Sequence, residues 1–330
     1  MRRKLVSSLG VLLGISLAGC SISAVNTSWN GDELKVWLYV TEEEFADFNK
    51  IVDEWAAENN QQVEVSRKEG DIGEYIAMSL DEKGPDIVWG AGGEEIAQLF
   101  DYDLIEEADT SYIDGNEYLT EDLIQAASIE GVQYSFPISQ ETVAVYYNKE
   151  LVDKVPESME QLVDIGKEKG FYYGITDAYL SMGFLTSGNC YLFAKEGNGY
   201  NIKDLGMNNS DVEKIYEFLG DLVLKDKLMP EDVNDNIGNA QFYNGNSAFY
   251  LATSRQMAGF RNATVNFSVI PIPTLFNNEV KPFKQIDVAF VSPKSNKKDN
   301  SYKLLADILD NSSEIVWKQG ESNSCTKKVC

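Results

Sequence analysis

The chain has 330 residues, 43% of them hydrophobic, and its 53 Asp and Glu against 28 Lys and Arg give a formal net charge of −25. This length supplies a large core and favours two domains over one. The negative charge argues against a nucleic-acid partner and against electrostatic docking on anionic lipid. The chain contains no His, which excludes His-based acid–base catalysis and His metal ligands.

The N-terminal segment has the pattern of a bacterial lipoprotein signal peptide over residues 1–19. Residues 2–4 are basic, and residues 5–17 form a 13-residue apolar run that is too short to span a bilayer. Small residues then precede Cys20, so we expect cleavage before Cys20 and lipidation of its thiol, with palmitate among the acyl groups. The alternative is an ordinary signal peptide with an incidental cysteine. Lipidation predicts a protein anchored at the extracytoplasmic face of the cell membrane, either on the cell surface or in the periplasm.

The segment after the signal peptide is polar, and we expect residues 20–32 to be a tether between lipid and domain. Cleavage removes three basic residues and no acidic one, so the formal charge falls from −25 to −28. Apart from Cys20, the cysteines are Cys190, Cys325 and Cys330. Three cysteines cannot all pair with one another, and although Cys325 and Cys330 are close enough in sequence to bridge, nothing requires it.

The first third of the chain alternates strand and helix patterns, which predicts a parallel α/β layer. Thr41 and Glu44 fit a capping box for the first helix, whose apolar residues recur at helical spacing. The strands are expected at residues 34–40, 62–66 and 86–89, and the helices at 41–58, 72–83 and 94–100.

The middle of the chain predicts a short helix capped by Thr120 and then a turn at Glu130-Gly131. Two β-rich runs follow, at 132–138 and 142–147, and Pro137 marks an edge or exit point. Glu141 lies between these runs. Its side chain is either a solvated turn residue or a ligand-facing group at a junction between lobes.

The remaining segments again mix helix and strand patterns. Helices are expected at 158–169 (capped by Ser158 and Gln161), 177–193, 210–222 (capped by Ser210 and Glu213), 239–243, 253–260 (capped by Thr253), 300–310 and from Ser313 onward. Strands are expected at 171–175, 248–252, 265–270 and 286–291.

Several motifs occur together in a recognisable order: LKVWLYV, GPDIVWG, YSFPISQETVAVYYNKELV, GNGYNIKDLG, AQFYNGNSAFYLATSRQMAG, VIPIPT and PKSNKKDNSYKLLADIL. Over residues 33–315 the chain resembles the extracellular solute-binding proteins of carbohydrate ABC importers, maltodextrin-binding proteins among them. The resemblance implies a two-lobe α/β fold of the type II periplasmic-binding class, with strands crossing between the lobes. It further implies a sugar bound in the cleft, the permease subunits of an ABC importer as partners, no cofactor or metal, and no enzymatic activity.

The resemblance also divides the chain into lobes. Residues 33–139 and 286–330 are expected in the N-lobe, and residues 140–285 in the C-lobe. The first crossing strand is expected from Pro137 to Asn148, and the return near residues 283–288.

The family's sugar site maps onto three residues of this chain, and Trp89, at the end of the GPDI strand, is a fourth candidate. Glu141 matches the carboxylate at the lobe junction, which would accept hydrogen bonds from sugar hydroxyls. Asp177 and Tyr179 match the acid and the aromatic residue of the C-lobe, and Tyr179 would stack on the apolar face of a pyranose. Trp89 would line the cleft. The alternatives are a hinge-capping or solvated Glu141, a loop acid at 177, a core-edge Tyr179 and a core Trp89.

Other positions depart from the maltodextrin-binding pattern. After Trp89 the chain reads Gly90-Ala91-Gly92-Gly93-Glu94, so two glycines and Glu94 stand where those proteins have an aromatic residue and an Asp-Arg pair. Thr41 and Glu42 replace their Asp-Lys. Arg255 stands near their stacking Trp, where its guanidinium would lie flat on a ring or fork onto a carboxylate, or would merely be a surface residue. These changes count against maltose itself and leave open a different or charged sugar. The candidate site therefore includes Glu42, Glu94 and Arg255.

The C-terminal segment after residue 320 is polar, and the family continues there with further helices. We expect a truncated product, with residues 321–330 disordered and an incomplete C-lobe that is less stable than the N-lobe. The alternative is a shorter natural variant.

Three functions compete. The leading one is a lipid-anchored sugar-binding component of an ABC importer. The others are a glycosidase using a carboxylate pair such as Glu141 and Asp177, and a truncated, non-binding paralogue that acts as a surface antigen or scaffold.

Overall fold

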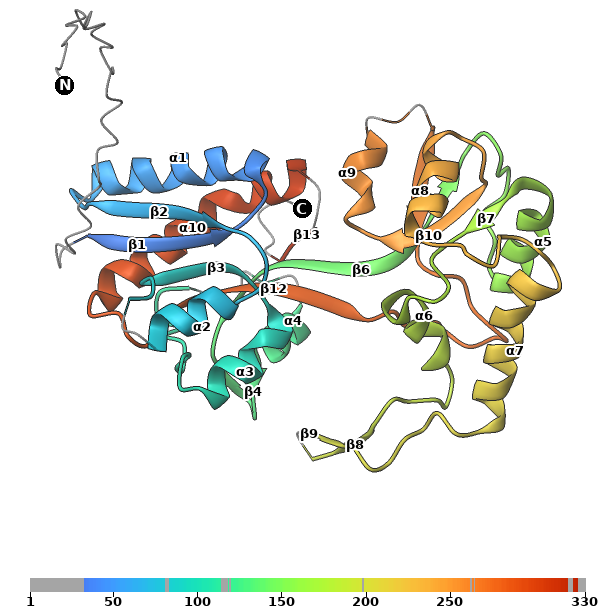
Figure 1. Ribbon diagram of the computed structural model, residues 1–330, viewed down its shortest axis with the longest axis horizontal. Helices are drawn as coiled ribbons and strands as arrows, with labels where there is room; N and C mark the ends of the chain where they lie inside the picture. The colour runs from blue at the N-terminus through green and yellow to red at the C-terminus, as the bar shows by residue number, and fades with distance from the viewer. Residues whose placement is uncertain are drawn as a thin grey trace, which may run out of the picture. The chain divides into compact units, whose positions relative to one another are not determined.

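Two large groups of buried apolar residues organise the described part of the chain, with a smaller aromatic cluster beside the second. Strands β6 (Phe136–Asn148) and β12 (Lys284–Val291) run side by side between the two large groups (Figure 1). The computed structural model describes residues 33–80, 83–113, 118, 120–197, 199–261, 263, 265–319 and 323–325. The predicted signal peptide, Cys20 and the tether lie outside the described residues. Among the helices that are described, none combines the length and the apolar character needed to cross a membrane.

The strands are β1 (Leu34–Tyr39), β2 (Val63–Lys68), β3 (Ile87–Gly92), β4 (Ser128–Ile129), β5 (Val132–Gln133), β6 (Phe136–Asn148), β7 (Phe171–Tyr172), β8 (Ala194–Glu196), β9 (Gly199–Asn201), β10 (Phe249–Thr253), β11 (Phe267–Ile270), β12 (Lys284–Val291) and β13 (Asn323–Ser324). The helices are α1 (Glu42–Glu58), α2 (Gly73–Leu80), the 3₁₀ turn η1 (Gly93–Glu95), α3 (Ile96–Asp101), α4 (Glu121–Ala126), α5 (Met159–Lys169), α6 (Ala178–Leu185), α7 (Ser210–Leu224), α8 (Asp235–Tyr243), α9 (Gln256–Arg261) and α10 (Lys298–Gln319).

The first core is built on the sheet order β2-β1-β3-β12-β6. Strands β2 and β3 each pair with β1 in parallel, which confirms the predicted parallel layer. Strand β12 then joins antiparallel to both β3 and β6. The buried apolar residues of this core come from residues 34–138 and 286–325.

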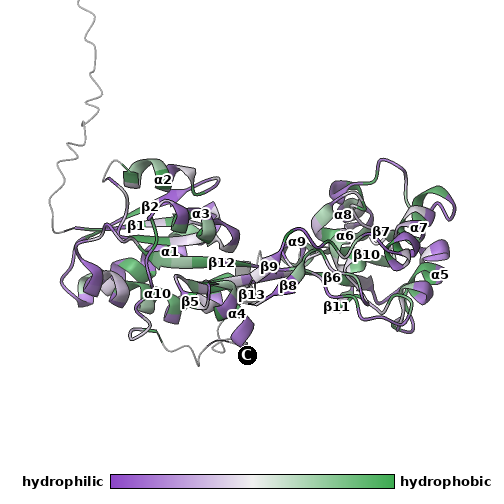
Figure 2. Cartoon of the chain, turned by 90° about the horizontal axis from the view of Figure 1, so that it is seen from below, coloured by the Kyte–Doolittle hydropathy of each residue, from purple (hydrophilic) through white to green (hydrophobic). Residues whose placement is uncertain are grey.

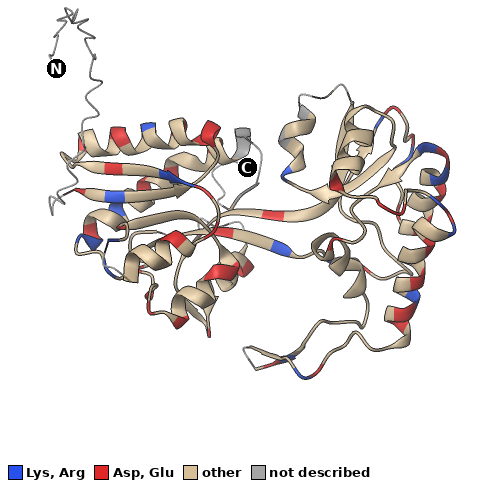
Figure 3. Cartoon of the chain, in the orientation of Figure 1, with Lys and Arg blue, Asp and Glu red and all other residues tan. Residues whose placement is uncertain are grey.

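Helix α1 begins where the sequence predicted. The Thr41 hydroxyl accepts from the backbone N–H of Glu44, whose carboxylate accepts in return from the backbone N–H of Thr41. The capping box is therefore confirmed, and it satisfies N–H groups that have no partner within the helix. Phe48, Val52 and Trp55 are buried on one face. The other face is mostly acidic (Figure 3).

Helix α10 is one continuous helix, so the prediction of two helices divided near Ser313 was wrong. Ser312 and Ser313 lie in its middle and are buried. A serine inside a helix costs little when the apolar residues around it keep the helical spacing. Apolar and polar residues alternate along this helix in Figure 2, and Leu304, Leu305 and Ile308 are buried in the first core.

The turn predicted at Glu130-Gly131 is confirmed, because it joins β4 to β5 in an antiparallel hairpin. Both residues have positive φ, at 51° and 84°, as a two-residue hairpin loop of the I′ type requires. The two β-rich runs that follow are one strand, β6, and Glu141 lies inside it. The expectation that Glu141 separates two strands was therefore wrong, and Pro137 is tolerated where the β6–β12 register shifts.

The second core gathers around the C-terminal half of β6, which pairs antiparallel with β10 and with β11. Strand β7 continues this sheet beyond β10. Helices α5, α6 and α7 bury their apolar residues against it, and an aromatic cluster forms beside it from Tyr146, Phe242, Tyr250, Phe260 and partly buried Phe267. We propose that the two cores mark the two lobes at the boundaries expected from the sequence.

Several helix limits in the second core differ from those expected. Helix α6 ends at Leu185 rather than at residue 193. Asn209, not Ser210, caps α7, because its side chain accepts from the N–H groups of Asp211 and Val212. Thr253 belongs to β10, and α9 begins only at Gln256. An Asx or Ser/Thr beside a helical pattern predicts a cap well, but the residue chosen can shift by a few positions.

The predicted disorder of residues 321–330 was wrong for residues 323–325. Asn323 and Ser324 pair antiparallel with Gln140 and Ser139 of β6, and Cys325 is fully buried in the first core. The N–H and C=O groups along this edge of β6 can pair with a further strand. The polar composition of residues 321–330 did not indicate such a pairing. The other residues of this range lie outside the described residues.

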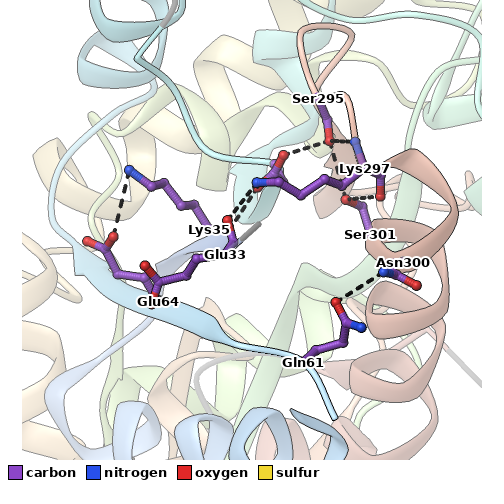
Figure 4. Close-up of polar contacts among 9 residues, drawn as sticks. Glu33, Lys35, Gln61, Glu64, Ser295, Lys297, Asn300 and Ser301 are labelled. Carbon is purple, nitrogen blue, oxygen red and sulfur yellow. Dashed lines mark hydrogen bonds and ion pairs between the residues drawn. The ribbon is translucent and has the colours of Figure 1, made fainter. Parts of the chain in front are cut away.

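A polar network at Asp86 fixes the start of β3 against the chain that enters α10. The Asp86 carboxylate accepts from the backbone N–H of Lys35 at 2.9 Å and from the Ser295 hydroxyl at 2.6 Å. The ammonium group of Lys297 lies 3.3 Å from the same carboxylate and 2.6 Å from the carbonyl oxygen of Glu33. Figure 4 draws the contacts of Glu33, Lys35, Ser295 and Lys297.

Candidate functional site

A cavity of about 400 Å³ opens at the edge of the first core where β1, β2 and β3 end. The carboxyl ends of parallel strands meet at one edge of a sheet, which is where open α/β folds bind ligands. The lining residues are Tyr39, Val40, Thr41, Glu44, Phe48, Arg67, Lys68, Glu69, Gly70, Trp89, Gly90, Ile138, Ser139, Arg255, Asp287 and Val316. Among these described residues, Arg255 alone comes from the elements of the second core.

Glu141 and Arg255, both predicted site residues, form an ion pair. The Nε–H of Arg255 donates to Oε2 of Glu141. Glu141 is buried, with 7% of its surface exposed, and burial raises the pKa of its carboxyl although the attraction of Arg255 opposes the rise. A solvated turn residue, one alternative for Glu141, does not fit this burial.

Asp287 is a site residue that the sequence reasoning missed. It lies opposite Ser139 in the β6–β12 pairing, and the Ser139 hydroxyl donates to its carboxylate at 2.5 Å. Asp287 lines the cavity, and burial raises the pKa of its carboxyl, with Arg255 lowering it and Glu94 raising it. Asp287 could have been found from the sequence because it lies on the return strand expected near residues 283–288. A carboxylate on a strand that crosses between lobes points either into the cleft or to the opposite face of the sheet.

The raised pKa of Asp287 predicts a pH-dependent effect of Asp287→Asn. The folded protein holds this proton more tightly than the unfolded chain, so the free energy of unfolding falls as pH rises from the unfolded pKa to the raised folded pKa. The amide cannot ionise and still accepts from Ser139. We therefore expect Asp287→Asn to have a higher Tm than the parent at pH 7, by a margin that shrinks as the pH is lowered toward 4.

Thermal unfolding at both pH values measures this margin. Asp221→Asn, at an exposed ion pair on α7, serves as the control. An equal margin at pH 7 and pH 4 would contradict the assignment.

Tyr179 lies against both crossing strands. Its hydroxyl is 3.5 Å from the carbonyl oxygen of Glu141 and 3.4 Å from that of Phe283. The side chain is half-buried, and burial together with the Glu141 carboxylate raises its pKa to about 12. Tyr179 and Glu94 both line a second hollow of about 430 Å³, in which the Gln285 side chain donates to the Glu94 carboxylate at 3.2 Å.

Asp177 is the N-cap of α6. Its carboxylate accepts from the backbone N–H of Tyr179 at 2.7 Å and from that of Leu180 at 3.4 Å. Its position matches the family's C-lobe acid, but its observed contacts are those of a capping residue. The carboxylate pair of the glycosidase alternative therefore includes one member that is already engaged by backbone.

Trp89 and Glu42 have neighbours within the first core. Trp89 is only 1% exposed and packs against Phe48 with 5.3 Å between ring centroids, so it is a core residue that also floors the cavity. Glu42 is exposed and lies 2.9 Å from the guanidinium of Arg67, which lines the cavity. Arg67 also pairs with Glu69.

The structure thus brings together Glu141, Arg255 and Tyr179 at the crossing strands, with Trp89 on the wall of the same cavity as Arg255. It leaves Asp177 at a helix cap. Besides Asp287, the sequence reasoning missed Arg67 and Tyr39. Both stand at the end of a parallel strand, and that position is the signal by which they could have been found.

Comparison with known families identifies the class of protein. Residues 50–317 match the family described as bacterial extracellular solute-binding protein. The match covers most of the chain, so the chain belongs to this family, and the resemblance inferred from its motifs is confirmed at that level. The relatives below are binding proteins rather than enzymes, which confirms the prediction of no enzymatic activity.

The chain is similar to two binding proteins of known name. It is 27% identical to a maltodextrin-binding protein of Bacillus subtilis, over 81% of this chain and 66% of that protein. It is 25% identical to a maltooligosaccharide ABC transporter solute-binding lipoprotein of Streptococcus pneumoniae R6, over 94% of this chain and 78% of that protein. The chain therefore spans just under two thirds of the length of the Bacillus relative.

A solved structure confirms the fold. The maltose-maltodextrin binding protein of Alicyclobacillus acidocaldarius superposes with a TM-score of 0.78 over 90% of this chain and 82% of that one, at 24% identity. The predicted two-lobe α/β fold with strands crossing between the lobes is thus confirmed.

Proposed function

We propose that this protein is the substrate-binding component of an ABC importer and captures a sugar or oligosaccharide related to maltodextrin in the cavity beside β6 and β12. Membership of the solute-binding family supports a binding role, and the names of the relatives support a saccharide. The ligand favours a closed arrangement of the lobes if it binds that arrangement more tightly than the open one.

The observation that carries the proposal is the lining of the cavity. The aromatic ring of Tyr39 stands beside a carboxylate from Asp287 and a guanidinium from Arg255, with the buried Trp89 beneath them. Saccharides present apolar C–H faces, which pack on aromatic rings, and hydroxyl groups, which both donate and accept hydrogen bonds. A cavity of this composition suits a polyhydroxylated ligand.

Thermal shift with a panel of maltooligosaccharides, galactooligosaccharides and monosaccharides, on protein comprising residues 21–330, tests the proposal. We expect at least one saccharide to raise Tm, and isothermal titration to give a stoichiometry of one without product formation. Because Asp287 lines the cavity, Asp287→Ala should weaken that binding by about tenfold to a hundredfold, since a hydrogen bond to a charged group contributes about 1.5–3 kcal/mol. If no saccharide binds to the folded protein, a non-binding scaffold becomes the better reading, and turnover of an oligosaccharide would point to a glycosidase.

We further propose that the protein is anchored to the extracytoplasmic face of the membrane by lipid on Cys20 and delivers its ligand to the permease. The Streptococcus relative is named a lipoprotein of an ABC transporter, which supports both parts. Palmitate labelling of the full chain, lost in Cys20→Ser, tests the anchor.

A further inference from the structure

We propose that Arg255, rather than Glu141, is the residue that touches the ligand at the crossing strands, and that Glu141 acts as a positioning residue for Arg255. This inference rests on the proposed function of the same cavity. It reverses the expected role of Glu141, which the family resemblance made a direct acceptor for sugar hydroxyls.

The first support is the difference in accessibility between the two partners. The Glu141 side chain is 9% exposed and is not among the residues that line the cavity. The Arg255 side chain is 42% exposed and does line it. A ligand in the cavity therefore meets the guanidinium before it meets the carboxylate.

The second support is the geometry of the ion pair. Glu141 engages Arg255 through Nε, the nitrogen nearest the aliphatic stem. A guanidinium carries five N–H donors in one rigid plane, so fixing Nε also fixes the direction of the terminal nitrogens. The carboxylate of Glu141 therefore sets the orientation of the whole group.

The third support is that the ion pair orders Arg255 before a ligand binds. Glu141 is carried by β6, the strand that passes from one core to the other, whereas Arg255 follows β10 in the second core. An arginine side chain has many rotamers, so holding it in a single orientation when a ligand binds costs conformational entropy unless a partner holds it beforehand. The ion pair makes that ordering part of the ligand-free protein.

The ligand group that Arg255 binds must be a hydrogen-bond acceptor. A guanidinium donates hydrogen bonds and accepts none, so Arg255 recognises a ring or hydroxyl oxygen of a saccharide, or a carboxylate on an acidic one. The neighbouring Asp287 accepts, so the two residues together select a ligand group that presents an acceptor beside a donor.

A double-mutant cycle tests the assignment, with maltotriose as the first probe and any saccharide found by thermal shift as the second. Glu141→Ala, Arg255→Ala and the double variant are compared by isothermal titration. We expect each single change to weaken binding about tenfold or more, and the double variant to bind as weakly as Arg255→Ala alone, because Glu141 acts only through Arg255. Additive losses would overturn the proposal, since they would show that Glu141 contacts the ligand itself.

Two further measurements keep the test decisive. Lys225→Ala, at an exposed ion pair on α7, is the matched control and should bind like the parent. In the ligand-free protein, the Nε–H resonance of Arg255 should be protected from exchange with water, and Glu141→Ala, which removes the acceptor, should remove that protection.

If no saccharide binds, the proposed function fails, and this NMR readout still decides the positioning role. Protection that persists in Glu141→Ala would overturn that role, and its loss would support it.

Discussion

Asp86→Ala is expected to lower the free energy of unfolding of the first core by about 3–5 kcal/mol, the cost of removing one partner from a buried charge pair. The Asp86 side chain is 10% exposed and that of Lys297 is 18% exposed, so neither charge is well solvated. The substitution leaves the Lys297 ammonium with less compensation and takes the acceptors from the Lys35 N–H and the Ser295 hydroxyl. An unsatisfied buried donor costs about 1–3 kcal/mol by itself.

Urea unfolding followed by tryptophan fluorescence measures this loss, because Trp37, Trp55 and Trp89 all lie in the first core. Asp86→Asn keeps the shape and one acceptor oxygen and should lose less than Asp86→Ala. Asp221→Ala removes an exposed partner of Lys225 and should change stability by no more than about 0.5 kcal/mol. Equal losses at Asp86 and Asp221 would show that the network contributes little.

The parts of the fold that could be predicted are those in which one local pattern is sufficient. The capping box at Thr41 and Glu44, the apolar face of α1 and the turn at Glu130-Gly131 each rest on a few neighbouring residues, and all three are present. The parallel pairing of β1 with β2 and with β3 followed from the alternation of strand and helix.

The parts that could not be predicted depend on partners distant in sequence. The pairing of β13 with β6 joins residues more than 180 positions apart, and only the free edge of β6 explains it. The continuity of β6 through Glu141 likewise depends on β12 as its partner. Strand propensity alone predicts that an acidic residue interrupts a strand. In the structure, the backbone pairing of Glu141 with Gln285 of β12 keeps Glu141 within β6.

The candidate site shows the same division. Glu141 and Arg255 were singled out separately, each by its position in the family pattern, but nothing in the sequence indicated that they would pair. Asp287 lay on the expected return strand, but the face of the strand to which its side chain points became known only with its pairing to Ser139. Side-chain pairing across strands is set by register, and register is a tertiary property.

Gly90→Ala is expected to be the most damaging small substitution at the cavity, because two costs fall on one residue. Gly90 has φ of +89°, a region that costs an L residue about 1–2 kcal/mol. A Cβ at this position would lie 2.3 Å from the carbonyl oxygen of Tyr39, a backbone atom that cannot move without shifting the end of β1. We expect a total loss of about 3 kcal/mol or more in the free energy of unfolding.

Gly131→Ala separates the two costs. Gly131 has φ of +84°, nearly the same as Gly90, but a Cβ there would meet no atom within 4 Å. Its substitution should therefore cost only the conformational part, about 1 kcal/mol. Urea unfolding of both variants measures the difference, and equal losses would show that β1 and β3 yield to the added methyl group.

The same two variants can be compared for saccharide binding. Tyr39 and Gly90 both line it, so a shift of β1 at Tyr39 would change the cavity wall in Gly90→Ala, whereas Gly131 lies in the distant β4–β5 turn. Saccharide affinity should fall in Gly90→Ala and stay at the parent value in Gly131→Ala. In the sequence, Gly90 is only a departure from the family pattern. The expected result would show that Gly90 allows the ends of β1 and β3 to approach closely enough to form the site.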